Sequence, residues 1–293
     1  MHLLYLRDFL NSLDFPFYVC HSYHDKDFQM HKHVDFSELV IVLDGTATHC
    51  VNNETYFIKR GDVFVVNGDT EHEYRNTDGF LACTIMYYPE IFFSPFLDIR
   101  KSTGFHALFV IEPYFTKSQG FKSRLVLDKN EFERVKTMTS IMIDEYDKKL
   151  NGWQTMTRAY FLSLITILSR LYSLPAYDIN TNVINIAKSV AHIESYFNEA
   201  ISVSNLASLS NLSVRHYLRC FKDTYKTTPS NYIFNLRLQY ACQLLKNTSI
   251  KISDVALQSG FNDFSYFTRR FHKSFGINPS EYRNFASQRD NEN

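Results

Sequence analysis

Short runs of apolar residues, each bounded by polar turn formers, occupy the first third of the chain. The runs "ELVIV" at 38–42 and "DVFVV" at 62–66 are rich in β-branched residues, and Asn52 and Asn53 mark a turn between two further runs. Runs of this composition, separated by Asn and Gly, are typical of strands joined by tight turns. Their frequency predicts a small antiparallel β-barrel or jelly roll over residues 1–128.

The apolar pattern changes to a helical period farther along. Residues 129–150 and 152–173 each carry apolar residues three to four positions apart, which predicts two helices joined at Asn151-Gly152 as an αα-hairpin. The second helix is apolar around most of its circumference, so one side is free to pack on the barrel and another on a second subunit. We therefore expect residues 129–174 to form a hairpin that offers a surface for a homodimer, followed by a linker at 175–185.

The last third of the chain contains an internal repeat. The segment "LSVRHYLRCFKDTYKTTPSNYI" (212–233) aligns with "NDFSYFTRRFHKSFGINPSEYR" (262–283). Arg219, Phe221 and Pro229 recur 50 positions later as Arg269, Phe271 and Pro279. Each copy predicts a short amphipathic helix, a tight turn and a second helix, which is the helix-turn-helix motif. We place the two motifs at 203–225 and 252–275.

Helix-boundary residues support this assignment. In the second copy we expect Ser253 and Asp263 to cap helices and Gly260 to form the turn in the left-handed conformation. Between the copies, residues 229–247 start with a proline and predict one long helix. At about 1.5 Å per residue this helix spans about 28 Å, close to the ~34 Å between successive major grooves on one face of DNA. The fold class is therefore α+β, a barrel followed by an all-α domain.

Composition and charge narrow the function classes. The chain has 293 residues, 45% of them hydrophobic, which is enough for two domains with cores. From Val183 to the end there are 13 Lys+Arg against 8 Asp+Glu, and before it 18 against 23. This basic end indicates a polyanion as partner.

The same composition argues against a membrane or secreted protein. The most apolar stretch, Ala159–Leu174, is short and contains Arg170, and the amino terminus has Arg7 and Asp8 where a signal peptide would be apolar. Five cysteines without CxxC spacing indicate reduced thiols. We expect a cytoplasmic protein with no membrane partner.

The repeat region resembles the DNA-binding domain of the AraC/XylS family of bacterial transcription regulators. The resemblance rests on "ISDVALQSGFNDFSYFTRRFHKSFGINPSEYR" and extends over residues 186–289. In the first copy the turn glycine of the family is replaced within "SLSNLS", and a second family glycine is Thr227. The resemblance implies binding to double-stranded DNA.

The second helix of each copy supplies the candidate DNA-binding residues. They are the predicted outward positions Val214, Arg215, Leu218 and Arg219 in the first copy and Phe264, Ser265, Thr268 and Arg269 in the second. Arginine offers a bidentate fork to guanine, so Arg219 and Arg269 are the preferred base contacts. The alternative is that these two arginines contact phosphate or form a salt bridge within the helix. Lys222, Lys226, Arg270 and Lys273 are expected to contact phosphate or solvent.

The front of the chain resembles the cupin fold. "HKHVDFSELVIVLDG" has the HxH, Glu and Gly spacing of the first cupin motif, and Gly61, His72 and Asn76 follow the second. In metal-binding cupins the residues matching His31, His33, Glu38 and His72 hold a divalent ion, and such a set suits Zn, Fe, Mn or Ni. The alternative is that these four side chains bind a sugar's hydroxyl groups without any ion. His21, His24 and His49 are expected at the surface or the barrel rim.

Within the AraC/XylS family the chain is most similar to activators of L-rhamnose operons. The similarity rests on "DF.ELVIV..G...H..N...Y.I.RGD.F" in 35–64 and on "YYPE" at 87–90. It implies a transcription activator of sugar metabolism genes, with a small sugar bound in the barrel and with Asp254 and Asp263 contacting the sigma subunit of RNA polymerase. We expect no enzymatic activity. The alternatives are a cupin isomerase or dioxygenase with a DNA-binding tail, and a regulator that needs no effector.

Overall fold

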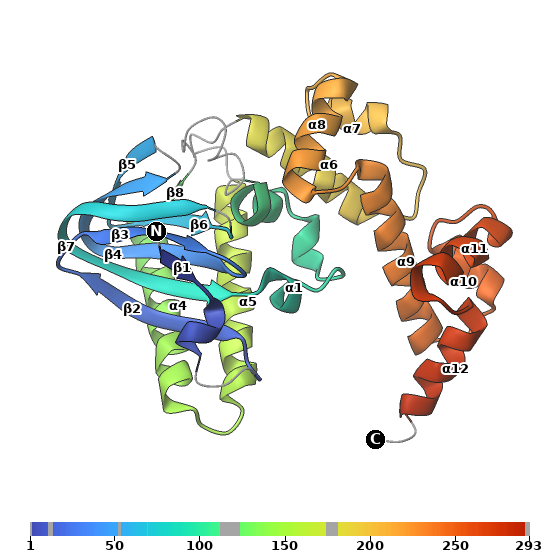
Figure 1. Cartoon of the computed structure of the whole chain (residues 1–293), viewed down its shortest axis with the longest axis horizontal. Helices are drawn as coiled ribbons and strands as arrows, with labels where there is room; N and C mark the ends of the chain where they lie inside the picture. Colours follow the sequence, from blue (N-terminus) through green and yellow to red (C-terminus); the bar gives the residue numbers. More distant parts are fainter. Residues whose placement is uncertain are drawn as a thin grey trace. The chain divides into compact units, whose positions relative to one another are not determined.

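The protein divides into two compact units, Met1–Ala187 and Lys188–Asn293. The computed structural model describes residues 2–10, 14–51, 54–68, 70–111, 124–173 and 181–290 (Figure 1). The first unit is built on strands and the second on helices, as the sequence predicts. The α+β fold class is therefore confirmed.

Two long, bent strands organise the first unit. The described strands are β1 (His2–Leu4), β2 (Phe17–His24), β3 (Phe28–His33), β4 (Ser37–Val51), β5 (Glu54–Lys59), β6 (Asp62–Val66), β7 (Glu71–Tyr87) and β8 (Leu125–Val126). β4 and β7 pair antiparallel along most of their length. On their other edges, β4 pairs β6 near its start and β5 near its end, whereas β7 pairs β3 near its start and β2 near its end. The result is a strand-rich sandwich with an interior, typical of a jelly roll.

The bend of this strand pair depends on two glycines. Gly45 and Gly79 both have positive φ, +69° and +56°, and the β4–β7 register shifts around Gly45. A Cβ atom on Gly45 would lie 2.2 Å from the carbonyl oxygen of Gly79. Only glycine fits there, because any side chain would collide with the facing backbone.

An apolar core fills the interior of the sandwich. Val40, Val42, Phe64, Tyr74 and Phe80 are buried together in one cluster. The alternation along each strand sends these side chains inward, since successive residues point to opposite faces.

A helical layer covers one side of the strands. The helices of the hairpin are α4 (Lys129–Lys148) and α5 (Trp153–Tyr172), and the shorter pieces are η1 (Leu6–Phe9), α1 (Pro89–Phe92), η2 (Asp98–Lys101), α2 (Thr103–Phe105) and η3 (His106–Ile111). Phe161 of α5 lies against Phe17, with ring centroids 5.0 Å apart, and against Tyr87, at 4.9 Å. This aromatic layer fixes the hairpin on the sandwich, as the apolar circumference of α5 predicts.

The predicted hairpin is present, whereas part of the predicted linker is helical. The helices are joined at a turn in which Lys149 and Gly152 adopt the left-handed conformation. The predicted turn at Asn52-Asn53 and the first part of the predicted linker, residues 175–180, lie outside the described residues. The rest of that linker, 181–185, is helical, because α6 (Thr181–Tyr196) begins there.

Among the described helices, none is long and apolar enough to cross a bilayer.

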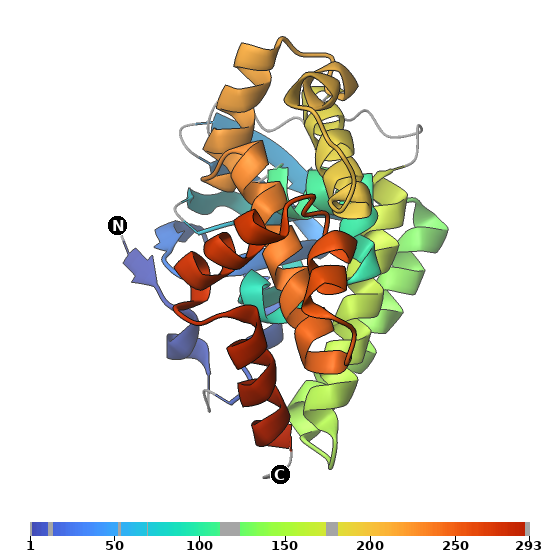
Figure 2. The ribbon, with the colours of Figure 1, turned by 90° about the vertical axis from the view of Figure 1, so that its right-hand side faces the viewer.

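The second unit consists of helices around two small cores. After α6 come α7 (Val203–Leu209), α8 (Val214–Tyr225), α9 (Pro229–Asn247), α10 (Ile252–Gln258), α11 (Phe264–Phe275) and α12 (Pro279–Asp290). One core packs around Tyr217 and Phe221 of α8, and the other around Phe267 and Phe271 of α11. Both cores include residues of α9, so the long helix joins two helix-turn-helix motifs, α7–α8 and α10–α11 (Figures 1 and 2).

Turn and cap residues differ in part from the sequence-based expectation. Gly260 is left-handed as predicted, with φ +86°, and the matching residue of the first motif is Asn211, with φ +52°. Asparagine tolerates this conformation better than most residues, so the missing glycine leaves the first turn intact. The position matching Gly276 is Lys226, also left-handed, and not Thr227 as expected.

One predicted cap is wrong and another is confirmed. Ser253 lies inside α10, whose N-cap position is Lys251, and its hydroxyl contacts Asp254 instead of a backbone amide. Asp263 accepts a hydrogen bond from the backbone N–H of Tyr266 at 2.7 Å and caps α11. In the first motif Ser213 has the same role for α8.

Candidate functional site

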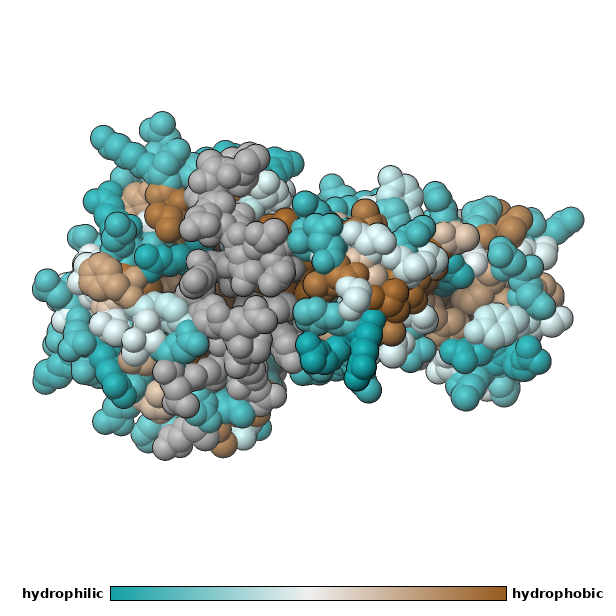
Figure 3. Space-filling view, turned by 90° about the horizontal axis from the view of Figure 1, so that it is seen from above, coloured by the Kyte–Doolittle hydropathy of each residue, from teal (hydrophilic) through white to brown (hydrophobic). Residues whose placement is uncertain are grey.

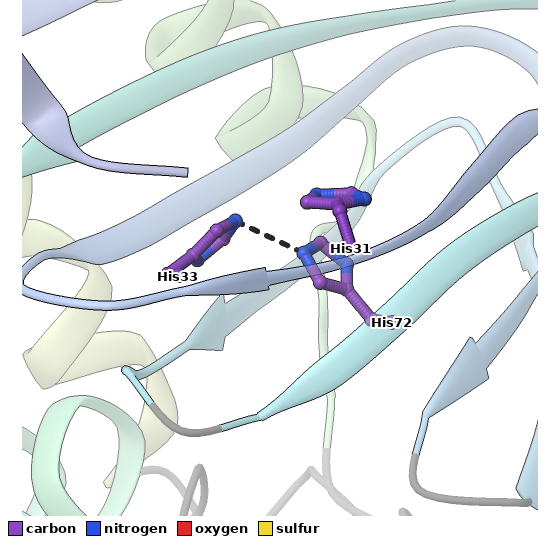
Figure 4. Close-up of side chains that lie close together, drawn as sticks. All are labelled: His31, His33 and His72. Carbon is purple, nitrogen blue, oxygen red and sulfur yellow. Dashed lines mark hydrogen bonds between the residues drawn. The ribbon is translucent and has the colours of Figure 1, made fainter. Parts of the chain in front are cut away.

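Three histidines from two neighbouring strands meet inside the sandwich. His31 and His33 lie on β3, and His72 lies on β7 opposite His31 in the strand register. Their candidate ligand nitrogens all lie within 4.8 Å of one another. The Nε2 atoms of His33 and His72 are 3.1 Å apart, the hydrogen bond drawn in Figure 4. The predicted HxH spacing thus places both histidines on one face of the strand, next to the third.

Glu38 of β4 completes this group. Its Oε2 atom lies 3.6 Å from Nε2 of His33 and 3.7 Å from Nε2 of His72. All four residues are buried, with exposed fractions of 6% or less. The structure therefore brings together the four residues that the sequence analysis selected.

His49 belongs to the same group, which corrects the expectation that it lies at the surface or rim. It is fully buried, and its Nε2 atom lies 3.2 Å from Nδ1 of His72. The expectation failed because His49 follows the bend at Gly45, where register shifts in β4 decide which way the later side chains point. His21 is exposed, as expected, and His24 is half-buried.

Burial sets the charge of this group. Desolvation lowers the pKa of His33 and of His49 to about 3, and lowers the pKa of His31 and of His72 as well. Desolvation also raises the pKa of the Glu38 carboxyl to about 8. At pH 7 the imidazoles are neutral, so each ring has one nitrogen lone pair to offer to a ligand.

The donor set fits a divalent cation. Glu38 Oε2 is buried without a hydrogen-bond partner among the described residues, and it lies beside the Nε2 atoms of His33 and His72. Three neutral imidazoles and a carboxylate are ligands for Zn, Fe, Mn or Ni, and a cation would neutralise the charge of an ionised Glu38. The same orphaned oxygen would equally accept a hydrogen bond from a hydroxyl group of an organic ligand.

A cavity of about 150 Å³ adjoins the histidine group. Its walls include His31 and Glu38 together with a pair of hydroxyl side chains, Ser22 and Thr84. Ser22 donates to Thr84 at 2.7 Å across β2 and β7. The hydroxyl of Tyr74, a further wall residue, is buried without a hydrogen-bond partner in the described part of the chain. Ser22, Tyr74 and Thr84 are not among the predicted site residues, because their convergence depends on strand pairing.

A larger and more open hollow of about 580 Å³ lies elsewhere in the first unit. It is bordered by Asp35, Asn67, Glu90 and Arg100 among apolar residues. None of the predicted site residues borders it. We therefore assign the candidate effector site to the smaller cavity, where orphaned polar atoms converge.

The second helices of the two motifs expose most of the predicted DNA-binding residues. Exposed are Val214, Arg215, Leu218 and Arg219 on α8 and Phe264, Ser265 and Arg269 on α11. Thr268 is half-buried and donates to the carbonyl oxygen of Phe264 at 3.0 Å. Arg219 and Arg269 occupy matching positions, so each motif presents one arginine from the same place on its second helix. Figure 3 shows one face of the molecule, on which hydrophobic residues lie among hydrophilic ones.

Arg270 differs from its neighbour Arg269. Its guanidinium group lies over the ring of Phe234 on α9, 4.0 Å from the ring centroid. A stacked arginine of this kind is held against the protein by a cation–π interaction. Arg270 therefore packs between α11 and α9, and its contact with phosphate or solvent stays a prediction.

Both predicted sigma-contact residues are exposed on the second motif. Asp254 lies in the first turn of α10 and Asp263 caps α11. Asp263 uses one carboxylate oxygen for its cap, so its second oxygen can accept a bond from another group.

Known proteins share both halves of this architecture. A family profile described as a helix-turn-helix domain matches residues 206–284, and one described as a cupin domain matches residues 19–86. The HTH-type transcriptional activator RhaS of Escherichia fergusonii is 30% identical over 256 residues, which cover 86% of each chain. The HTH-type transcriptional activator RhaR of Mannheimia succiniciproducens is 26% identical over 281 residues, 93% of each chain. A solved transcriptional regulator with an AraC-type DNA-binding domain, from Chromobacterium violaceum, is 33% identical over 36% of this chain and 93% of its own, with a TM-score of 0.33.

Proposed function

Because the chain belongs to the AraC-type family of helix-turn-helix transcriptional activators, we propose that it activates sugar metabolism genes when a small sugar binds in its barrel. The prediction of a DNA-binding regulator that is not an enzyme is confirmed by this membership. The effector, the contact residues and the assembly are our proposals.

The proposed DNA-binding residues lie on α8 and α11. Arg219 and Arg269 contact base edges in two successive major grooves, and the 19-residue helix α9, about 28 Å long, connects the two motifs. The two contact surfaces are completed by Arg215, Leu218, Phe264, Ser265 and Thr268. The single observation that carries this proposal is the recurrence of an exposed arginine at the same place in both motifs.

The effector is proposed to occupy the cavity beside the histidine group. Its chemistry suits a polyol: Glu38 and Tyr74 offer orphaned oxygen atoms, and Ser22 and Thr84 offer hydroxyl groups. Buried polar atoms without partners cost free energy, so a ligand that satisfies them gains affinity. The relatives named RhaS and RhaR make L-rhamnose the first sugar to test.

The response requires a difference in affinity. A sugar changes transcription only if it binds one arrangement of the two units more tightly than another.

We propose that residues 1–128 bind the effector, that 129–174 join two chains into a dimer, that 175–185 link the halves and that 186–289 bind DNA. We also propose that Asp254 and Asp263 contact the sigma subunit of RNA polymerase. The protein is proposed to act in the cytoplasm.

Fluorescence anisotropy of the full-length protein on the DNA upstream of its gene tests this function. The titration is run at fixed salt, without sugar, with L-rhamnose and with a panel of other monosaccharides, because salt alone changes affinity strongly. A shift with one sugar supports the proposal and names the effector. DNA binding that no sugar changes would contradict the sugar effector and leave a regulator that responds to another ligand, such as a divalent cation, or to none.

A divalent cation in the histidine group is a second candidate ligand. The observation that favours it is the approach of three buried imidazoles to within 4.8 Å, beside the orphaned Glu38 Oε2. His31, His33, His72 and Glu38 would hold the cation, which would act there as a Lewis acid toward a ligand oxygen.

A further inference from the structure

We propose that His49 is a positioning residue that holds the His72 ring in the tautomer and orientation needed to bind a divalent cation. This inference rests on the cation site proposed above. Neither cupin motif in the sequence includes His49, and the structure alone brings it to the group.

The geometry assigns this role through one hydrogen bond. Nε2 of His49 lies 3.2 Å from Nδ1 of His72, whereas the Nε2 atom of His72 faces His33 and Glu38. A histidine that binds a metal through Nε2 must carry its proton on Nδ1 and commonly donates that proton to a neighbouring acceptor. His49 Nε2 is such an acceptor for His72.

The proton positions in the group show why this acceptor matters. The contact between Nε2 of His33 and Nε2 of His72 is a hydrogen bond only if one of the two nitrogens carries a proton. A cation bound by both rings needs both Nε2 lone pairs, so each ring must then carry its proton on Nδ1. For His72 the Nδ1 proton would be donated to His49. His49 accepts this bond through Nε2 only when its own proton is on Nδ1, so the bond fixes the tautomers of both rings and the orientation of His72.

Packing keeps His49 in place for this purpose. It is fully buried, and its ring is stacked on Phe64 with centroids 4.7 Å apart and lies 5.0 Å from Tyr74. A ring that is held between two aromatic side chains in the interior cannot easily turn away from His72. His49 and His72 lie on strands β4 and β7, which pair directly, so the strand register fixes their separation.

Metal titration of the chelator-treated full-length protein tests the proposal. Co²⁺ alone is added first and followed by its visible absorption bands, and the affinity for Zn²⁺ is then measured by competition with a chromophoric chelator. The variants are His49→Phe, which keeps an aromatic ring without the acceptor, and His49→Gln, whose amide oxygen can still accept. His21→Phe, at an exposed histidine, is the matched control.

We expect His49→Phe to weaken Zn²⁺ binding by roughly 10- to 100-fold, the usual effect of removing such a partner. His49→Gln should recover most of that loss, and His21→Phe should bind as the unaltered protein does. Thermal unfolding without metal checks that each variant folds, and His49→Leu replaces His49→Phe if the latter does not.

Two results would overturn the proposal: unchanged Zn²⁺ affinity in His49→Phe, or an equal loss in His49→Phe and His49→Gln. Absence of saturable cation binding by the unaltered protein would also overturn it. In that last case a sugar-dependent shift in DNA affinity would show that the proposed regulatory function stands without the cation.

Discussion

Arg237 of the connecting helix α9 donates through Nε to the carbonyl oxygen of Phe197 at 2.6 Å. A second bond runs from its Nη2 atom to the carbonyl oxygen of Glu199, at 2.7 Å. Both acceptors lie between α6 and α7, just before the first helix-turn-helix motif. A Cβ atom on Gly260, in the turn of the second motif, would lie 2.9 Å from Nε of Arg237. One guanidinium thus bonds to the entrance of the first motif and lies close to the turn of the second.

Replacing Arg237 should destabilise the DNA-binding unit. Hydrogen bonds to charged groups contribute about 1.5–3 kcal/mol each, so Arg237→Met is expected to lower the free energy of unfolding by at least about 2 kcal/mol. Urea unfolding followed by helical circular dichroism measures the change. Lys246→Met, at an exposed position of the same helix, is the control and should unfold as the unaltered protein does.

The two motif turns should respond differently to substitution. Gly260→Ala puts a methyl group on a residue with φ +86° and within 2.6 Å of the carbonyl oxygen of Asn198, so it should cost more than about 1 kcal/mol. Asn211→Gly, at φ +52° in the first motif, should change stability by less than about 1 kcal/mol. Equal effects in parallel urea titrations would contradict this difference between the two turns.

Arg269 should contribute base specificity. Arg269→Ala is expected to weaken binding to the specific site by ~1–3 kcal/mol and to relax the preference at one base pair. Anisotropy titrations with a set of singly altered operators measure both effects. Lys273→Ala provides the comparison, because loss of a phosphate contact weakens binding to all sequences and lowers the salt dependence. A uniform loss for Arg269→Ala would make Arg269 a phosphate contact.

A buried histidine outside the ligand group should make the first unit sensitive to acid. Burial, with the nearby Arg100 charge, lowers the pKa of His106 to about 3, and Nε2 of the ring bonds to the carbonyl oxygen of Arg100. The unfolded chain, with a histidine pKa near 6.5, binds more protons in the window from about pH 3 to about pH 6.5, so stability falls as the pH is lowered through that window. Between about pH 7 and about pH 5 this single group should cost about 2 kcal/mol.

Unfolding measured at the higher and at the lower pH separates the contribution of His106 from that of the other titrating groups. Trp153 is the single tryptophan of the chain and packs against Phe15 and Tyr146, so its fluorescence reports the first unit. His106→Gln should be less stable than the unaltered protein at the higher pH but should lose less stability on going to the lower one. If both proteins lose the same amount, His106 does not titrate in this way.

Local patterns in the sequence determined the helices, the repeated motifs and part of the candidate site of this protein. The helical period and the proline at its start predicted residues 229–247, the bounds that α9 has, and the repeat predicted both helix-turn-helix motifs. The HxH spacing placed His31 and His33 together because side chains alternate along a strand. Such features depend on neighbours within a few positions, which is why a linear pattern contains them.

Contacts between distant segments were decided only by the tertiary structure. His49 joins His72 because two bulged strands pair in one register, and Arg270 turns to Phe234 because α11 packs on α9. Gly104 gave no signal in the sequence, yet a Cβ atom there would lie 1.9 Å from the carbonyl oxygen of Ser169 on α5. Residue type and spacing determined which side chains could bind DNA or a ligand. Burial and register, which depend on the whole chain, decided which of them meet.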